Sequence, residues 1–338
     1  MNKLCAFIGV LSLALFAWAP SIEQTHIAIP GIENFSAAAS AEEGVLLKQL
    51  DDRVEITIDG KPFSAYYTSA DQPKPYLHPL RAADGATLTR GYPMIKDDPN
   101  EASDRDHPHH RSCWFTHGDV NGVDFWSEGP RSGKIVHRGF DKIESGKDYG
   151  RLVARNDWVA PDGKRVLQET REIKFYRLAD ARMMDWTITL RPVDGPVKFG
   201  DTKEGTFGIR LATQLKGRLT GRIENSRGAV GEKEAWGKPA EWCDYTGLLQ
   251  GKRYGIAIFD HPSNFRHPTY WHVRDYGLFA ANPFGERDFF NDKTRDGSYA
   301  IQPGKELTFR YRVYIHQGTA AEAKVAEQYQ AYVKSAGK

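Results

Sequence analysis

The sequence predicts an all-β fold, a large antiparallel β-sandwich with a C-terminal helix, on three observations. Apolar and polar residues alternate over short segments such as 54–58, as in strands buried on one face. Asp-Gly pairs at 59–60 and 162–163 separate such segments, which is typical of tight hairpin turns. The 338 residues include 32 Gly, 18 Pro and 12% aromatic residues, a composition that favours short strands and turns over a helical bundle.

The elements follow in chain order. Strands are expected at 54–58, 63–67, 151–159, 166–176, 183–190, 207–212, 219–224, 254–259, 278–281 and 307–316. A helix is expected at 319–336, where apolar residues recur at helical intervals and Thr319 is placed to cap the first turn. No period of 20 to 50 residues recurs, so the pattern excludes a solenoid or a propeller. The long segment 73–108 is expected to be a functional loop.

The N-terminus carries an export signal. Lys3 precedes an apolar run, residues 4–19, and two Ala-x-Ala sites follow at 17–19 and 39–41. We therefore expect residues 1–41 to be a signal peptide with a processed or disordered leader, and 42–338 to be a single β-sandwich domain. The alternative is an uncleaved membrane anchor; no later segment is apolar enough to span a bilayer. The expected location is periplasmic or extracellular, with no membrane association after signal removal.

Charge and motif content exclude several classes of protein. The chain has 46 Lys and Arg against 44 Asp and Glu, and the two signs are interspersed. Because the sequence shows no basic block, a nucleic-acid partner is not expected. The sequence has no GxGxxG, GxxxxGK[ST], HExxH or GxSxG motif, so no nucleotide cofactor is expected. After signal removal Cys113 and Cys243 remain, either paired or as two buried thiols.

Polar and aromatic residues gather between 107 and 126. The histidines His107 and His110 can transfer protons near neutral pH or ligate a metal. Asn121 and Asp124 offer hydrogen-bonding partners, and Trp126 offers a flat apolar face. Sugar rings need this combination, because hydroxyls take directed hydrogen bonds and the C–H face stacks on aromatic rings. The structural alternative is that some of these histidines only bind loop backbone.

Two further segments have similar content. A tyrosine, a histidine and an arginine lie in a Pro- and Gly-rich loop, and a second loop after the strand at 254–259 mixes histidine, arginine, asparagine and tryptophan. Loops at the ends of a rigid sheet often build binding sites, although stiffened surface loops look alike in sequence. The expected substrate-binding residues here are Tyr76, His78, Arg90, Asn264, Arg266, Trp271 and His272.

Glu204 and Arg210 complete the candidate set. We expect His107 or His110 to transfer a proton at a sugar oxygen, with Glu204 as the opposing acid or base. Arg90 and Arg210 would stabilise developing negative charge, while Trp126 and Trp271 would flank the ring. An ordinary surface ion pair is the alternative for any single carboxylate.

Four long motifs resemble a bacterial family labelled "methane oxygenase PmoA": PYLHPL with TRGYP, DHPHHRSCWFTHGDVNGVDFW, KEGTFGIRLA and FDHPSNFRHPTYWHVRDYGLFAANPFG. The label does not fit this chain, because the particulate methane monooxygenase subunit is an integral membrane protein. The resemblance implies a β-sandwich akin to the galactose-mutarotase-like fold, in proteins that accompany sugar-degrading and sugar-oxidising systems. The family pattern HHRG is replaced here by Ser112 after Arg111, so a side chain stands where glycine is expected.

Three functional hypotheses remain. The first is a secreted carbohydrate-active enzyme, of the glycoside hydrolase, lyase or epimerase type, that uses histidine and carboxylate acid–base chemistry on a small-molecule carbohydrate. The second is a noncatalytic carbohydrate-binding protein, which would use the same aromatic and polar groups without a titrating one. The third is a metal-dependent oxygenase in which the clustered histidines would bind the metal. A bound divalent metal is compatible with the sequence, but the sequence does not identify its ligands.

Overall fold

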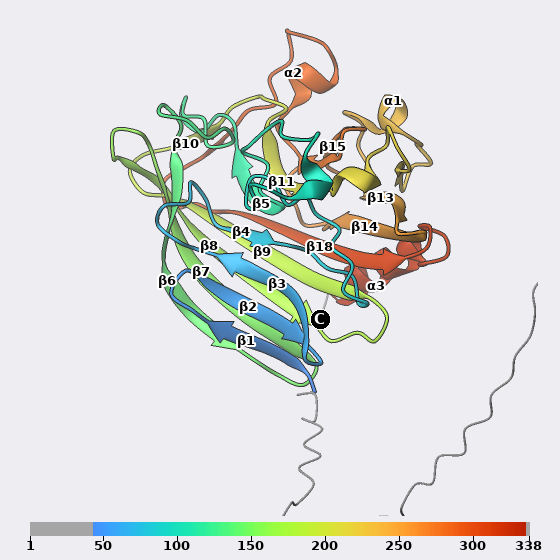
Figure 1. The fold of residues 1–338 in the computed structure, drawn as a ribbon. Helices are drawn as coiled ribbons and strands as arrows, with labels where there is room; N and C mark the ends of the chain where they lie inside the picture. The colour runs from blue at the N-terminus through green and yellow to red at the C-terminus, as the bar shows by residue number, and fades with distance from the viewer. Residues whose placement is uncertain (1–42, 336–338) are drawn as a thin grey trace, which may run out of the picture. The chain divides into compact units, whose positions relative to one another are not determined.

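The computed structural model describes residues 43–335, and the predicted signal peptide and leader lie outside the described residues. Two large antiparallel sheets face each other (Figure 1). The eight strands of the first sheet are, in spatial order, β1 (Val45–Gln49), β2 (Arg53–Ile58), β3 (Lys61–Tyr67), β4 (Tyr76–His78), β5 (Cys113–His117), β11 (Gly205–Arg210), β16 (Leu278–Asn282) and β15 (Tyr270–Val273).

The second sheet also has eight strands, several of them long. Their spatial order is β12 (Arg222–Asn225), β13 (Trp242–Leu249), β14 (Lys252–Asp260), β18 (Leu307–Gln317), β9 (Arg182–Pro192), β8 (Arg165–Tyr176), β7 (Tyr149–Val159) and β6 (Lys134–Glu144). A small pair, β10 (Val197–Phe199) with β17 (Tyr299–Ile301), stands apart. The short helical turns are Pro99–Glu101, Thr213–Leu215, α1 (Glu232–Ala235) and α2 (Glu286–Phe289), and the terminal helix is α3 (Val325–Ser335).

The core lies between the two sheets. Strand β8 alternates buried and partly exposed residues over most of its length, as a strand with one inward face must. Aromatic rings from the two sheets interlock: Phe207 of β11 lies 4.8 Å from Tyr311 of β18 and 5.1 Å from Trp186 of β9, centroid to centroid. The predicted antiparallel β-sandwich with a C-terminal helix is confirmed. Among the described residues, no helix is long and apolar enough to cross a bilayer.

The terminal helix begins later than predicted. Thr319 and Glu322 do exchange the reciprocal hydrogen bonds of a capping box. Lys324, however, has a left-handed φ of 54°, which interrupts the turn, so α3 starts only at Val325. Local capping chemistry was therefore correctly located, but the backbone reversal after it was not predictable from side-chain spacing.

The two cysteines are both buried free thiols. Cys113 belongs to β5 of the first sheet and Cys243 to β13 of the second. This settles the alternative that the sequence left open in favour of two unpaired side chains.

A buried imidazole–carboxylate pair gives the stability a defined pH dependence. His316 Nε2 lies 3.0 Å from Asp244 Oδ1, and the ring passes over Gly255 of the intervening strand β14, where a Cβ would collide with it. Burial alone lowers the pKa of His316, but the hydrogen bond and charge of Asp244 outweigh it and raise the pKa above the ordinary value.

The sign of this effect follows from linkage. A histidine whose pKa is raised by folding contributes its full stabilisation of the fold at a pH below its unfolded-state pKa of about 6.5. This contribution is lost as the pH rises through the folded-state pKa. We expect the free energy of unfolding to fall above about pH 6.5 in the wild type, and this fall to be smaller in His316→Gln. Urea unfolding of both proteins across that range measures it; equal slopes would contradict the assignment.

Candidate functional site

The face of the first sheet that points away from the core carries the chemistry. Side chains alternate along a strand, so β5 buries Cys113 and Phe115 in the core and turns Trp114 outward. In the same way β15 buries Trp271 and turns His272 outward. The sequence-predicted residues on this outer face are Tyr76 and His78 of β4, Arg210 of β11 and His272 of β15.

Four aromatic rings form a stack over this face, which we call the histidine stack: Tyr276, His107, His110 and Trp114. The His107 centroid lies 5.2 Å from Tyr276, with planes 7° apart, and 4.7 Å from His110, with planes 11° apart. The stack continues from His110 to Trp114, and the centroids of these two rings lie 5.2 Å apart. Trp126 meets His110 in an edge-to-face contact at 5.7 Å.

Two fully buried arginines, Arg90 and Arg210, hold the stack through acidic side chains. Asp106 Oδ1 accepts from Arg90 Nη1 at 2.8 Å and from Arg210 Nη2 at 2.7 Å. Asp104 pairs with Arg210 at 3.1 Å and with Lys216. Arg90 also donates to the carbonyls of Tyr92 and His107. Arg90 and Arg210 therefore use most of their guanidinium N–H groups on Asp104, Asp106, His110 and backbone carbonyls, and so position the site. Their role toward developing negative charge stays a prediction.

The tautomer of His110 is set by Arg210. Arg210 Nη1 lies 3.1 Å from His110 Nδ1, and since a guanidinium only donates, Nδ1 accepts and Nε2 carries the proton. Burial, with the nearby charges of His109 and Arg210, lowers the pKa of His110 well below its ordinary value. This contact and the lowered pKa favour a neutral ring that donates through Nε2 over the expected titration near neutrality.

His107 has the opposite arrangement. Its Nδ1 lies 3.0 Å from Asp106 Oδ2, within ion-pair distance, although the contact lacks the geometry of a hydrogen bond. A proton held on Nδ1 by this carboxylate would leave Nε2 as an acceptor. About 39% of the side chain is exposed, so Nε2 is open to a ligand. Burial opposes ionisation of Asp106, but Arg210 and the hydrogen bonds of His107 and Arg90 lower its pKa. A carboxylate kept ionised in this way orients the imidazole as a base.

The residue after Arg111 has the backbone that the family pattern implies. Ser112 adopts φ = 62°, in the left-handed region that glycine favours. Its Oγ donates to Thr89 Oγ1 at 2.8 Å, and Thr89 Oγ1 in turn accepts from the Leu80 backbone N–H. The side chain therefore ties the histidine segment to the neighbouring loop, which glycine could not do.

A buried lysine supports the Trp126 side of the stack. Lys74 Nζ, 1% exposed, donates to the Trp126 carbonyl and pairs with Glu128 at 2.9 Å. Arg111 clamps Glu128 with two hydrogen bonds of 2.7 and 2.8 Å. Asp124 Oδ1 accepts from the backbone N–H of Trp126 at 2.8 Å. Asp124 therefore shapes the turn that carries Trp126 and has no observed role toward a ligand.

Glu204 and His272 lie at the other margin of the site. Glu204 is about one-third exposed and pairs with Lys203 at 3.2 Å; its charge contributes to raising the pKa of Tyr276 to about 12, although burial is the larger cause. His272 Nδ1 donates to the Lys203 carbonyl at 2.7 Å, which leaves Nε2 as an acceptor. Burial lowers the pKa of His272 to about 3.

Several buried polar atoms of this face have no hydrogen-bond partner among residues 43–335. Unpartnered buried polar atoms are rare in folded proteins, and an ordered water, an ion or a ligand can satisfy them. Those on this face are His78 Nδ1, His107 Nδ1, His110 Nε2, Trp114 Nε1, Trp126 Nε1, Arg210 Nε and His272 Nε2.

Four other predicted residues do not reach the site. Trp271 points into the core, where its Nε1 donates to the Ala240 carbonyl at 3.0 Å. Asn121 binds the backbone of Lys198, at β10. Asn264 binds Asp260 and the backbone of Arg310, and Arg266 donates to the carbonyls of Pro283 and Gly297. These four side chains have structural partners within the fold, and their roles toward a sugar stay predictions that the geometry does not support.

Further residues complete the site: Tyr276, Asp104 and Asp106, which the sequence did not single out, and His109, which belongs to the predicted histidine cluster. Tyr276 lies in the turn between β15 and β16, and the guanidinium carbons of Arg210 and Arg274 lie 4.9 and 5.4 Å from its ring centre. Asp104 and Asp106 belong to the long segment 73–108, which was expected to be functional without these two residues being named. His109 meets His110 edge-to-face at 4.5 Å. Asp106 could have been predicted from its position next to His107 in the sequence. For Tyr276 the sequence offered only its place in a turn shortly after His272.

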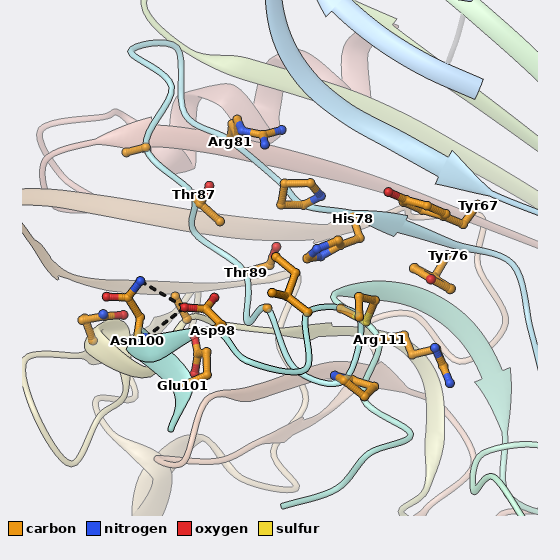
Figure 2. A pocket seen from close by; sticks show the side chains of 18 of the residues that line it. Tyr67, Tyr76, His78, Arg81, Thr87, Thr89, Asp98, Asn100, Glu101 and Arg111 are labelled. Carbon is orange, nitrogen blue, oxygen red and sulfur yellow. Dashed lines mark hydrogen bonds between the residues drawn. The ribbon is translucent and has the colours of Figure 1, made fainter. Parts of the chain in front are cut away.

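A pocket adjoins the histidine stack on the β4 side (Figure 2). Its volume is about 1340 Å³, and its wall includes Tyr67, Tyr76, His78, Thr89 and Arg111. Tyr76 is the neighbour of Trp114 in the sheet. The pocket and the stack therefore share one face of the molecule.

Within residues 43–335 there is no group of three or more His, Cys, Asp or Glu side chains arranged to hold a metal ion. The rings of His107 and His110 stack face to face instead of directing their nitrogens at one point.

The molecule is thus a two-sheet antiparallel sandwich with a polar, histidine-rich site on one outer face. A family model described as "Family of unknown function (DUF6807)" matches residues 53–330, and the chain belongs to this family. No curated protein matches the sequence.

Three solved structures are similar in fold at low identity. A galactose mutarotase-like protein from Clostridium acetobutylicum is 8% identical with a TM-score of 0.42, covering 81% of this chain and 98% of that one. Galactose 1-epimerase from Lactobacillus acidophilus NCFM is 8% identical with a TM-score of 0.37, covering 81% and 98%. A putative aldose 1-epimerase from Escherichia coli K12 is 12% identical with a TM-score of 0.31, covering 81% and 99%.

Proposed function

We propose that the protein is an exported carbohydrate-active enzyme of the sugar-epimerase type, with His107 as the proton-transfer group. The observation that carries this proposal is the Asp106–His107 pair. Its carboxylate is fixed by two buried arginines, and its imidazole presents an open Nε2 beside the N–H donor of His110. A general base needs this arrangement, a fixed tautomer with a free lone pair.

The neighbouring groups fit a sugar hydroxyl and ring oxygen. In the proposed step His107 Nε2 takes the proton of the anomeric hydroxyl while an acid on the far side of the ring protonates the ring oxygen. The bond between the anomeric carbon and the ring oxygen breaks, which gives the open-chain aldehyde. After rotation of the aldehyde group the ring closes: the attacking hydroxyl returns its proton to the acid, His107 returns its proton to the carbonyl oxygen, and the other anomer forms. Glu204 is the partly exposed carboxylate at the opposite margin and is assigned the second proton transfer. The step needs no redox partner.

The carboxylates favour this chemistry over glycoside hydrolysis. Hydrolysis by the usual route needs two free carboxyl groups on either side of the bond. Asp104 and Asp106 are committed to Arg90, Arg210 and Lys216, which leaves Glu204 as the accessible carboxylate of this site. A pure binding module would not need the fixed imidazole pair.

A substrate screen tests the proposal. Purified protein is incubated with freshly dissolved single anomers of common aldoses and, separately, with a panel of glycosides; NMR follows anomer conversion and product release. We expect faster anomer conversion of at least one aldose, and a loss of about 10²- to 10⁴-fold in that rate in Glu204→Gln. The matched control is Glu224→Gln on the second sheet. Sugar binding without acceleration of any conversion would establish the binding-module hypothesis instead.

A further inference from the structure

The pocket on the β4 side contains a cation without a counterion. Arg81 is partly buried in the pocket wall, and no hydrogen bond or ion pair of its guanidinium is found within the described residues. Burial lowers the pKa of Arg81, and the nearby Tyr67 side chain opposes this shift. An arginine in such a place costs solvation free energy that a bound anion would recover.

A buried histidine stands beside this arginine. His78 is 4% exposed and forms no hydrogen bond within the described chain, and its Nδ1 is buried without a partner. Figure 2 shows its imidazole projecting into the space bounded by Tyr76, Thr89 and Asp98. Burial, then the charge of Arg81, lowers the pKa of His78 to about 4, so the ring is neutral near pH 7 and offers one donor and one acceptor.

Among the described residues, Lys96 of the wall also lacks a partner, but its side chain is exposed to solvent. Other charged groups of the wall are partnered. Asp84 pairs with Lys252, Asp52 with Arg53, and Arg111 with Glu128. Asp98 bonds only to Asn100, through the backbone N–H and the side-chain amide. Its charge opposes that of Arg81 at His78. The pocket wall therefore presents the unpaired guanidinium of Arg81, the neutral imidazole of His78 and the accessible carboxylate of Asp98.

An aromatic wall completes the pocket. The rings of Tyr67 and Tyr76 are stacked, with centroids 5.1 Å apart and planes 14° apart. Such rings receive the C–H face of a sugar, while a carboxylate such as Asp98 accepts from hydroxyls.

We propose that this pocket is a second binding site, for a sugar acid, in which Arg81 binds the carboxylate and His78 and Asp98 bind hydroxyls. Neither a bare anion nor a neutral sugar uses all of these groups. The proposal does not rest on proton transfer at His107. A protein that binds sugar acids here but converts no sugar would refute the proposed function and leave this site standing.

Calorimetric titration of the full chain tests the proposal. The probes are D-glucuronate and D-gluconate, with D-glucose as the neutral analogue and inorganic sulfate as the bare anion. We expect at least one sugar acid to bind, more tightly than either D-glucose or sulfate. Arg81→Gln should weaken that binding about 10- to 100-fold, because the ion pair is lost. Arg81 has no hydrogen-bond or ion-pair partner among residues 43–335, so the variant should unfold at the same temperature as the wild type.

Two further variants test whether the affinity depends on the planar guanidinium of Arg81. Arg81→Lys keeps the charge but not the planar fork, so an intermediate loss is expected. Arg138→Gln, on β6 of the second sheet, should leave the affinity unchanged. Unchanged sugar-acid affinity in Arg81→Gln, equal binding of D-glucose or of sulfate, or no binding of any probe would each overturn the proposal.

Discussion

Replacing Arg171 by methionine is expected to destabilise the protein by about 3 to 5 kcal/mol. Arg171 and Glu169 are fully buried between the sheets, with Nε and Oε1 2.6 Å apart. Glu169 also accepts from Asn156 and from the indole N–H of Trp158. Removal of the guanidinium would leave a buried carboxylate without its counterion, and the cost of an unpaired buried charge is large.

The same arginine links the two sheets at the site. Its Nη1 donates to the carbonyl of Pro75, directly before Tyr76, at 3.1 Å. Urea unfolding of Arg171→Met measures the loss, and the double variant Arg171→Met/Glu169→Gln should recover part of it because neither charge remains. A single-variant loss below about 1 kcal/mol would show that the pair behaves like a surface ion pair.

His107→Gln and Asp106→Asn are each expected to lower the rate of sugar conversion by about 10²- to 10⁴-fold. Glutamine cannot accept and release a proton as imidazole does, and asparagine no longer fixes the Nδ1–H tautomer or carries the charge beside it. Because the two residues act as one unit, the double variant should be no slower than the slower single one.

The control for this pair is Asp141→Asn, which removes an exposed carboxylate paired with Arg155 on the second sheet. It should leave the rate unchanged. If Asp106→Asn retained the full rate while His107→Gln lost it, the carboxylate would have no role in orienting the ring. If the losses multiplied in the double variant, the two residues would act independently.

The long strands were predictable because their burial alternates. The segments at 151–159, 166–176 and 183–190 match β7, β8 and β9 closely, since each has one face in the core. The three-residue strand β4 was read as loop, because a strand that short has no measurable period and all its residues are buried. The start of α3 depended on the backbone conformation of Lys324, which no side-chain pattern encodes.

The site was predictable in its histidines and less so in their roles. His107 and His110 were identified by their local density, but only the fold shows that Arg210 blocks one nitrogen of His110 while Asp106 orients His107. Trp271 and His272 are adjacent in β15 and therefore point to opposite faces. Composition gave both residues the same role, whereas the register of β15 with β16 places one in the core and the other on the outer face.

Nitrogen-15 NMR of the imidazole rings, with and without a sugar that the screen identifies, tests the central claim most directly. Signals are assigned through the single His→Gln variants. We expect His110 to stay neutral, with its proton on Nε2, across neutral pH, and His107 in the sugar-free protein to carry a proton on Nδ1. We also expect the sugar to shift the Nε2 signals of both rings and to leave those of His316 unchanged. A His110 ring that titrates near neutrality, or His107 and His110 signals unmoved by a sugar that binds, would contradict it.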